Sequence, residues 1–367
     1  MARRISELQT TPQAQSEESQ RREQLAQWVV SFLLNENNHS SGLGIASENA
    51  SMPLQAIGSD AGFRKYYRVH TPDRSMVAVD AHLATEDSRT FVEIANRWKA
   101  GGVHVPEVYA VDYKNGFMLQ EDLGDTPMQI LLHNATADQY YPKLLETLML
   151  VQHQRSDNLP PYDEKLVRLE LSLYPHWFLG GLLKIETEQQ QIASQLNDLF
   201  SSLVASILEQ PQGTVHRDYH SRNLMMTPDG SIGVIDFQGA LHGPLLYDVV
   251  SLLKDCYISL PDEKINFWFS SFMARHPVLA NHDPEQLKTW FDFTGLQRHL
   301  KCLGIFSRLW LRDGKPGYLN DIPKTLGYVL SVCHRYPQFK EHAEWLQKHV
   351  DPIVDQRLRQ VVEDACV

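Results

Sequence analysis

Short runs of apolar residues with a two-residue period lie between residues 53 and 120. Such alternation, bounded by segments rich in Gly, Pro, Asp and Ser, predicts half-buried β-strands. The predicted strands are Leu54–Ile57, Lys65–Val69, Met76–Asp80, Val105–Asp112 and Gly116–Gln120. Together they predict a mostly antiparallel five-stranded sheet.

Apolar residues recur at helical spacing around this sheet and through most of the remaining chain. The predicted helices are Arg22–Leu34, Asp87–Lys99, Ala137–Arg155, Glu164–Leu183, Glu186–Glu209, Leu296–Arg312, Lys324–Tyr336 and His342–Val362. Residues 1–20, rich in Gln, Ser, Glu and Thr, predict a poorly ordered tail. The pattern therefore predicts an α+β protein, with a sheet-containing lobe over residues 21–122 and a mostly helical lobe over residues 123–367.

One hairpin interrupts the helical half of the chain. Two apolar runs flank Pro228-Asp229-Gly230, and Asp-Gly between such runs is a strong hairpin signal. A two-residue turn at Asp229-Gly230 would pair Asn223 with Asp236, with their Cβ atoms about 5 Å apart. A carboxamide oxygen and a carboxylate would then meet at the open end of the hairpin, where they could bind a hard divalent cation.

This pair of side chains predicts a magnesium site completed by phosphate. Mg²⁺ is usually held by one or two carboxylates together with substrate phosphates, and Asn223 and Asp236 supply that incomplete protein shell. Asp218 lies five residues before Asn223, on the loop that enters the hairpin. A carboxylate beside a metal-bound triphosphate can orient a hydroxyl group and accept its proton, which contributes roughly 10²–10⁴-fold where general-base catalysis operates. The string His216-x-Asp218-x-His220 also suggests a metallohydrolase, but that interpretation needs further ligands.

The motifs His216-Arg-Asp-Tyr-His-Ser-Arg-Asn223 and Asp236-Phe-Gln238 resemble the catalytic and metal loops of the kinase superfamily. Their form is typical of aminoglycoside phosphotransferase-like and choline-kinase-like enzymes. The chain is most similar to the bacterial kinases that phosphorylate the anomeric hydroxyl of N-acetylmuramate and N-acetylglucosamine in cell-wall recycling. Supporting stretches extend from about Ala56 to Val332. The resemblance implies a kinase-like two-lobe fold, ATP and Mg²⁺ as cofactors, and a sugar hydroxyl as acceptor.

The turn between the first two predicted strands is a candidate phosphate loop. Gly58 and Gly62 would let backbone N–H groups, including that of Ser59, approach phosphate oxygens closely. A plain hairpin would explain the same glycines, and both interpretations stay open. Three cationic residues follow the turn, namely Arg64, Lys65 and Arg68. We expect one of them to reach the nucleotide, with Arg64 as the first choice.

The crossing between the lobes resembles the kinase segment that presents backbone groups to adenine. The resemblance gives Glu121 and Leu123 that role through main-chain atoms.

One departure from the superfamily lies in the third predicted strand, where Asp80 stands in place of the lysine that binds the α- and β-phosphates. An unpaired carboxylate there would repel phosphate, so neutralisation would fall to Mg²⁺ and to cations from elsewhere. Glu93, on the predicted helix Asp87–Lys99, would either be exposed to solvent or pair with an arginine.

Several residues of the second lobe are candidates for support or for acceptor binding. By resemblance, Asp248 braces the catalytic loop from the following helix, and His216 fixes the loop by hydrogen bonding. His220 either plays the same part or faces phosphate or substrate. Arg298 and Lys301 lie near one another on a predicted helix, where they would either form surface salt bridges or meet an anionic part of the acceptor, such as a lactyl carboxylate.

Composition narrows the class of protein further. The formal charge of -11 argues against a general nucleic-acid or anionic-membrane binder, so a small-molecule ligand is expected. The four cysteines have no metal-binding spacing and fit a reducing compartment. The N-terminal segment has no apolar signal region, and no apolar run approaches membrane-spanning length. The sequence therefore predicts a cytoplasmic protein, and it contains no signal for its oligomeric state.

Three other functions share parts of this pattern. An aminoglycoside- or choline-type phosphotransferase would have the same core but a different acceptor pocket. A non-catalytic nucleotide-binding scaffold would explain the missing strand lysine. A protein kinase fits less well, because Gln238 rather than Gly follows Asp236-Phe237 and no Ala-Pro-Glu element follows.

Overall fold

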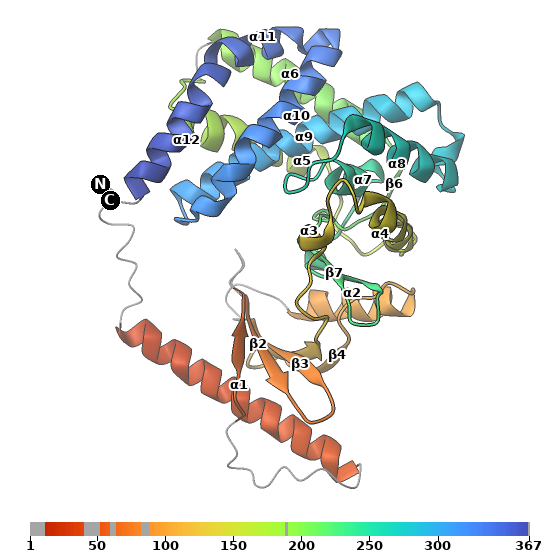
Figure 1. The fold of residues 1–367 in the computed structure, drawn as a ribbon, viewed down its shortest axis with the longest axis vertical. Coiled ribbons are helices and arrows are strands. Elements are labelled where there is room, and N and C mark those ends of the chain that lie inside the picture. Colours follow the sequence, from red (N-terminus) through yellow and green to blue (C-terminus); the bar gives the residue numbers. More distant parts are fainter. Residues whose placement is uncertain (1–11, 40–51, 59–63, 82–87, 188–189, 366–367) are drawn as a thin grey trace. The chain divides into compact units, whose positions relative to one another are not determined.

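The computed structural model describes residues 12–39, 52–58, 64–81, 88–187 and 190–365 (Figure 1). The chain divides into two compact units. The first unit contains residues 1–126 and 225–238, and the second contains residues 127–224 and 239–367. The segment 225–238, which the sequence pattern assigned to the helical lobe, thus groups with the sheet-containing unit.

The first unit is built on a five-stranded antiparallel sheet, as the sequence predicts. Its strands are β1 (Gln55–Ile57), β2 (Arg64–His70), β3 (Ser75–Ala81), β4 (Val108–Asp112) and β5 (Phe117–Glu121). Their order is β1-β2-β3-β5-β4, and every neighbouring pair is antiparallel. Strand β4 begins three residues later than the predicted Val105, and Pro106 explains the difference because proline has no N–H to donate to a sheet.

Helix α1 (Pro12–His39) covers one face of this sheet (Figure 1). Its residues Leu25, Val29 and Leu33 are buried in one cluster with alternate residues of β3, Met76 and Ala78. The helix is longer at both ends than the predicted Arg22–Leu34, because no glycine or proline interrupts residues 13–39. A second helix of this unit, α2 (Ser88–Ala100), buries Phe91, Ile94, Ala95 and Trp98.

The predicted hairpin is present as β7 (Leu224–Met226) and β8 (Ile232–Val234), but its turn differs from the expected one. The N–H of Thr227 donates to the Ser231 carbonyl at 3.1 Å, and the N–H of Gly230 donates to the Thr227 carbonyl at 2.9 Å. The turn therefore has three residues, with Gly230 at φ 83°. A two-residue turn would have placed Pro228 in the ladder, where it has no N–H, whereas it fits the second position of a type I turn.

This longer turn shifts the hairpin register by one residue. Continuing from the bond between Thr227 and Ser231, the register pairs Met226 with Ile232. The predicted pairing of Met226 with Gly233 is wrong. Direct opposition of Asn223 and Asp236 consequently no longer follows from the hairpin.

The second unit is mostly helical and also contains a two-stranded sheet, β6 (Gln212–Val215) with β9 (Leu241–Pro244). Its helices are α3 (Met128–Leu131), α4 (Ala137–Gln152), α5 (Glu164–Leu173), the π-helical segment η2 (Tyr174–Leu182), α6 (Gln190–Leu208), α7 (Leu246–Leu253), α8 (Asp262–Arg275), α9 (Pro284–Leu311), α10 (Ile322–Arg335), α11 (Lys340–His349) and α12 (Asp351–Ala365). The sequence pattern predicted only the second half of α9. Asp283 begins this helix by accepting a hydrogen bond from the N–H of Gln286 at 3.1 Å.

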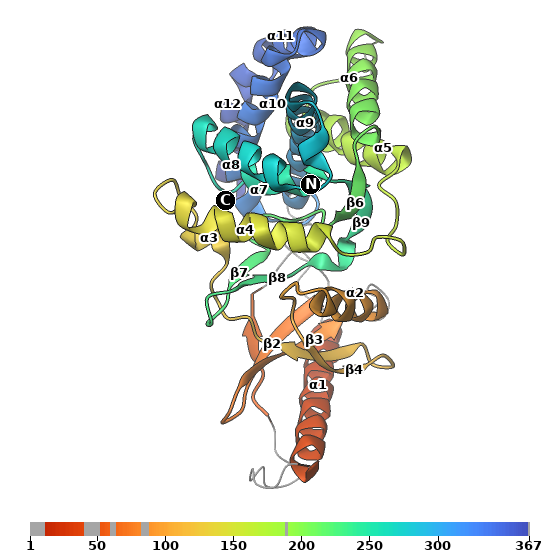
Figure 2. The same ribbon diagram turned by 90° about the vertical axis from the view of Figure 1, so that its right-hand side faces the viewer.

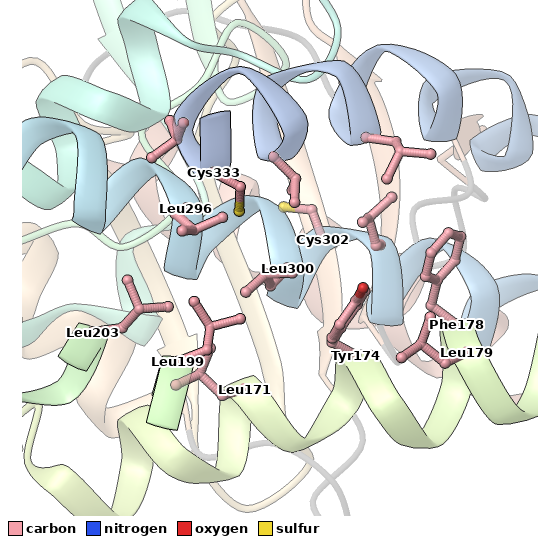
Figure 3. Close-up of a cluster of buried hydrophobic side chains, with 14 of the residues drawn as sticks. Leu171, Tyr174, Phe178, Leu179, Leu199, Leu203, Leu296, Leu300, Cys302 and Cys333 are labelled. Atoms are coloured by element: carbon pink, nitrogen blue, oxygen red, sulfur yellow. The ribbon is translucent and has the colours of Figure 1, made fainter. Parts of the chain in front are cut away.

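Helix α9 forms the core of the second unit and contacts α5, η2, α6, α7 and α10 (Figure 2). Leu296 and Leu300 of α9 pack with Leu171 of α5 and with Tyr174 and Phe178 of η2 (Figure 3). The two aromatic residues are fully buried. Both rings therefore belong to the core of the second unit. No helix of the described residues is long and apolar enough to cross a membrane.

Candidate active site

The loop His216–Asn223 connects β6 to β7 in the second unit, and Asp248 of α7 holds its start. The buried Asp248 carboxylate accepts the backbone N–H of His216 at 2.6 Å and that of Arg217 at 2.9 Å. Burial raises the pKa of Asp248 to about 7, although these two hydrogen bonds act in the opposite direction. Arg217 has φ 78°, a conformation that costs energy for a residue with a Cβ. The backbone that leads to Asp218 is thus held in place by Asp248 of α7.

Asp218 is half-buried and surrounded by positive charge within the second unit. Its backbone N–H donates to Nδ1 of His216 at 3.2 Å. Burial by itself would raise the pKa of the Asp218 carboxyl, but nearby cations, with Lys301 the strongest, lower it to about 2. Asp218 is therefore an ionised hydrogen-bond acceptor at neutral pH.

Asn223 is tied back to the same loop. Its side-chain Nδ2 donates to the backbone carbonyl of Asp218 at 3.0 Å, and its backbone N–H donates to the carbonyl of His220 at 2.9 Å. Because the amide nitrogen makes the first of these bonds, the orientation of the carboxamide is fixed and its oxygen is directed away from the Asp218 carbonyl. The two loop residues thus have a defined mutual geometry.

His220 lies between these two residues in the sequence. Its ring centroid lies 5.3 Å from that of Tyr257, in an edge-to-face arrangement. The half-buried imidazole has an Nδ1 without a hydrogen-bond partner among the described residues. Burial lowers the pKa of His220, which keeps the imidazole neutral near pH 7. A neutral imidazole can donate or accept one hydrogen bond at this nitrogen, depending on its tautomer.

Glu170 of α5 joins the catalytic loop to α9, a role that the sequence analysis missed. Its buried carboxylate accepts Nε of Arg217 at 3.1 Å and lies 3.3 Å from Nζ of Lys301. The other oxygen accepts the hydroxyl of Tyr162 at 2.7 Å and Nε2 of Gln297 at 3.2 Å. Two cations beside Asp218 therefore share one buried anion. Arg217 and Lys301 lie 47 and 131 positions from Glu170 along the chain, so no local pattern could reveal these two pairings.

Both basic candidates of α9 are buried, so their assignment to surface salt bridges is wrong. Lys301 donates to the hydroxyl of Tyr247 at 2.9 Å in addition to its ion pair with Glu170. Burial lowers the pKa of Lys301, but Glu170, Tyr247 and Asp218 together raise it, so the ammonium stays charged. Arg298, one turn earlier on the helix, donates through Nη1 to Sγ of Cys256 at 3.6 Å.

Asp236 belongs to the first unit and directly follows the hairpin. It is exposed, it has φ 62°, and its Oδ1 accepts Nε2 of Gln238 at 2.7 Å. The next residue, Phe237, is buried against the rings of Phe91 at 4.7 Å and Trp98 at 5.6 Å, both on α2. Helix α2 thus anchors the segment that carries Asp236.

The proposed adenine segment follows β5 in the first unit. The carboxylate of Glu121 contacts Nε2 of His104 and accepts the backbone N–H of Glu107, both at 3.1 Å. Leu123 is buried, and its side chain lies so close to Gly233 that a Cβ there would meet it at 2.7 Å. The backbone N–H of Glu121 donates to the Glu107 carbonyl at 2.8 Å. The adenine-binding role of the main chain of Glu121 and Leu123 stays a prediction.

Asp80, expected as an unpaired carboxylate, is bound by Arg21 of α1. Nε of Arg21 lies 3.0 Å from one carboxylate oxygen of Asp80, and Nη2 contacts the other. Asp80 lies on the same face of β3 as Met76 and Ala78, which pack against α1. The expected repulsion therefore does not arise, since a guanidinium neutralises the charge and the alternation of the strand turns the side chain toward α1.

The three cations near the predicted phosphate loop have different surroundings. Lys65 pairs with Glu18 at 2.6 Å, and Arg68 binds Asp122 at 2.6 Å and Asp125 at 2.7 Å. The buried Arg64 lies with its guanidinium 5.1 Å from the ring centroid of Phe91.

Of the loop itself, Gly58 has φ 45°, whereas Ser59 and Gly62 lie outside the described residues. Glu93 is exposed on α2. No group of three or more His, Cys, Asp or Glu among the residues described by the structure could hold a metal ion.

The fold of the chain is similar to that of solved small-molecule kinases. The choline kinase LicA from Streptococcus pneumoniae matches with a TM-score of 0.55 at 14% identity, covering 81% of this chain and 98% of that chain. An ethanolamine kinase from Plasmodium vivax matches with a TM-score of 0.56 at 13% identity, covering 79% and 83%. At such low identity the likeness establishes the fold alone, and it confirms the predicted kinase-like fold class.

Sequence relatives then define the family. A model of the phosphotransferase enzyme family matches residues 53–270. The N-acetylmuramate/N-acetylglucosamine kinase of Pseudomonas aeruginosa is 41% identical over 301 residues, which cover 80% of this chain and 87% of the relative. The protein of that name from Neisseria meningitidis is 36% identical over 298 residues, covering 78% and 87%. The chain belongs to the phosphotransferase enzyme family, and the prediction of such an enzyme is confirmed.

Proposed function

We propose that the protein transfers the γ-phosphate of ATP to the anomeric hydroxyl of N-acetylmuramate and N-acetylglucosamine in peptidoglycan recycling. The observation that carries the proposal is identity of 36–41% to kinases named for these two sugars, over most of each chain. The charge state of Asp218 is consistent with it. Use of ATP also fits the expected cytoplasmic location.

We assign Asp218 the role of binding the acceptor hydroxyl and orienting it toward the γ-phosphate. A carboxylate with a pKa of about 2 is a weak proton acceptor, so early deprotonation of the sugar is not its main contribution. Phosphoryl transfer through a loose transition state needs little deprotonation before bond cleavage, and positioning supplies most of the rate. Asp218 would therefore take the hydroxyl proton late, as the new bond to phosphorus forms.

We assign Asn223 and Asp236 the role of binding Mg²⁺. Their carboxamide and carboxylate oxygens are the donor types that Mg²⁺ prefers, and the hydrogen bond from Asn223 to the Asp218 carbonyl fixes the orientation of one of them. When bound, Mg²⁺ neutralises charge on the transferring phosphates. His216 and Asp248 support the catalytic loop from behind, through the contacts with its backbone.

The nucleotide is assigned to the first unit. The backbone of Glu121 and Leu123 would meet adenine, and the turn containing Gly58, Ser59 and Gly62 would meet phosphate. Arg64 remains the preferred cation for phosphate. Its contact with Phe91, which also packs on Phe237, links it to the segment that carries Asp236.

A screen of ATP consumption tests the proposal. Purified protein would be incubated with Mg²⁺-ATP and with N-acetylmuramate, N-acetylglucosamine, an aminoglycoside panel or choline, and products would be identified by phosphorus NMR. We expect an anomeric phosphate from both amino sugars only. Turnover confined to aminoglycosides or choline would replace the acceptor assignment. ATP binding without turnover of any acceptor would instead favour a nucleotide-binding scaffold.

A further inference from the structure

Arg298 of α9 is a buried guanidinium with little compensation. Its exposed fraction is 3%. Its single hydrogen bond among the described residues runs to Sγ of Cys256 at 3.6 Å, and no carboxylate of those residues forms an ion pair with it. Burying a charge without a partner costs several kcal/mol, so such groups in folded proteins normally meet a counter-ion.

Lys301, one turn further along α9, has an anionic partner inside the protein. Its ammonium lies 3.3 Å from the carboxylate of Glu170 and 2.9 Å from the hydroxyl of Tyr247. The sequence left open which of the two basic residues would meet an anionic acceptor. Because Lys301 already has its anion within the protein, Arg298 is the residue whose charge is still to be matched.

The groups closest to Arg298 supply only part of a counter-charge. Nearby Cys302 and Arg298 itself lower the pKa of the Cys256 thiol, against the effect of burial, and a thiol is at most a partial counter-charge. Asp255 acts on Arg298 without an ion pair, since its two oxygens accept the backbone N–H groups of Ser221 at 2.9 Å and Tyr257 at 2.7 Å.

Arg298 is also connected to the catalytic loop. It donates to Cys256, and both chain neighbours of Cys256 contact that loop: the Asp255 carboxylate accepts the backbone N–H of Ser221 at 2.9 Å, and the ring centroid of Tyr257 lies 5.3 Å from that of His220. The Nδ1 atom of His220 has no hydrogen-bond partner among the described residues. An unmatched cation and an unmatched ring nitrogen therefore occur in the same part of the second unit as the acceptor-orienting carboxylate.

We infer that Arg298 binds a carboxylate carried by the sugar acceptor and so determines the preference for an acidic over a neutral amino sugar. The inference rests on the proposed function, in which both sugars are acceptors. N-acetylmuramate differs from N-acetylglucosamine by a lactyl ether whose carboxylate is ionised at neutral pH. A guanidinium can receive that carboxylate through two parallel hydrogen bonds, which gives both affinity and orientation.

The test compares three acceptors in the complete protein: N-acetylmuramate, its methyl ester and N-acetylglucosamine. The wild type should use the acid with a lower KM than the ester. Arg298→Met should raise the KM for the acid roughly 10- to 100-fold, the range for a charge-assisted hydrogen bond. It should leave the ester and N-acetylglucosamine nearly unchanged and abolish the preference of acid over ester. Arg298→Lys should restore part of the preference, and Arg312→Met, at the exposed end of α9, is the control with no expected effect.

Three results would overturn the inference. Equal losses for acid, ester and neutral sugar would show that Arg298 is structural. Equal losses accompanied by a higher KM for ATP would show that it binds phosphate. An unchanged KM for the acid would show that it binds neither.

Two further comparisons keep these results distinct. If Arg298→Met does not fold, the wild type still decides the matter, because equal use of acid and ester would reject a carboxylate site. Failure of the wild type on every amino sugar would reject the proposed function itself, and this inference with it.

Discussion

Arg21 of the N-terminal helix binds both carboxylate oxygens of Asp80 on strand β3. The same guanidinium donates to the backbone carbonyl of Asn115 at 2.9 Å and lies over the ring of Phe117 at 5.2 Å. Helix α1 is thereby connected to β3 and β5 by charge as well as by apolar contacts. The N-terminal helix is part of the first unit and supplies the charge balance of its sheet.

We expect Arg21→Met to destabilise the protein by about 1–3 kcal/mol, because Asp80 would remain largely buried without its cation. Thermal unfolding measures the effect. The double variant Arg21→Met with Asp80→Asn should recover most of the loss, since the amide carries no charge. Arg22→Met is a useful comparison, because Arg22 lies on the same helix as Arg21 but does not contact Asp80. Additive losses in the double variant would contradict the pairing.

Asp218→Asn should lower kcat roughly 10²- to 10⁴-fold, because an amide can orient a hydroxyl only weakly and cannot take its proton. The KM for ATP should change little, and the unfolding temperature should fall only modestly, because the half-buried Asp218 loses its attraction to the neighbouring cations. Asp198→Asn, exposed on α6, is the matched control and should keep full activity. Native-rate phosphorylation by Asp218→Asn would remove Asp218 from the mechanism.

The five strands, the family and the order of the catalytic motifs could all be predicted because their signals are local. A period of two, a turn with Asp-Gly, and Asp218 followed by Asn223 can each be recognised within a few residues. The hairpin register was wrong by one residue because an Asp-Gly signal favours a two-residue turn, whereas Pro228 cannot donate in the ladder. The effect of Pro228 can be read from the sequence, so this error could have been avoided.

Pairings over long sequence separations could not be predicted. Arg21 and Asp80 are 59 positions apart, and Arg21 directly follows the segment 1–20, whose composition indicates little order. Glu170 follows buried positions such as Val167 at helical spacing, which could have indicated a buried carboxylate. Its partners on the catalytic loop and α9 depend on the packing of the whole second unit.

Glu170→Gln should cost about 3 kcal/mol of stability, because Arg217 and Lys301 would lose their shared anion in a buried position. It should also lower kcat, since both cations lie beside Asp218 and would adopt new positions. Urea unfolding and steady-state kinetics give the two readouts. Glu164→Gln on the same helix removes only an exposed pair with Arg168 and should cost less than about 0.5 kcal/mol. Similar losses in both variants would contradict the special role of Glu170.

Gly304→Ala should be strongly destabilising. A Cβ at this position of α9 would lie 2.4 Å from the backbone carbonyl of Leu173, so the two helical segments would have to separate. Gly327→Ala on α10 is the matched control, since nothing lies within 4 Å of its Cβ position. Alanine favours a helix over glycine by about 1 kcal/mol, so the control should be neutral or slightly stabilising. Unfolding temperatures that move in the same direction for both variants would contradict the close approach.

Asp292 of α9 should make stability depend on pH in the acid range. Its fully buried carboxylate lies 2.9 Å from Lys254, 2.8 Å from Lys288 and 2.6 Å from Arg335. Burial would raise the pKa of Asp292, but the neighbouring cations, Lys254 foremost, lower it from 3.8 to about 2. A carboxyl group with a lowered pKa stabilises the folded state above its unfolded pKa, and this contribution of about 2 kcal/mol is lost as the pH falls from about 5 to 2. Asp292→Asn should therefore be much less stable than the wild type at pH 6, and urea unfolding should show the difference shrinking toward pH 3. A difference that stays constant over this range would show that the pairing contributes through packing and not through charge.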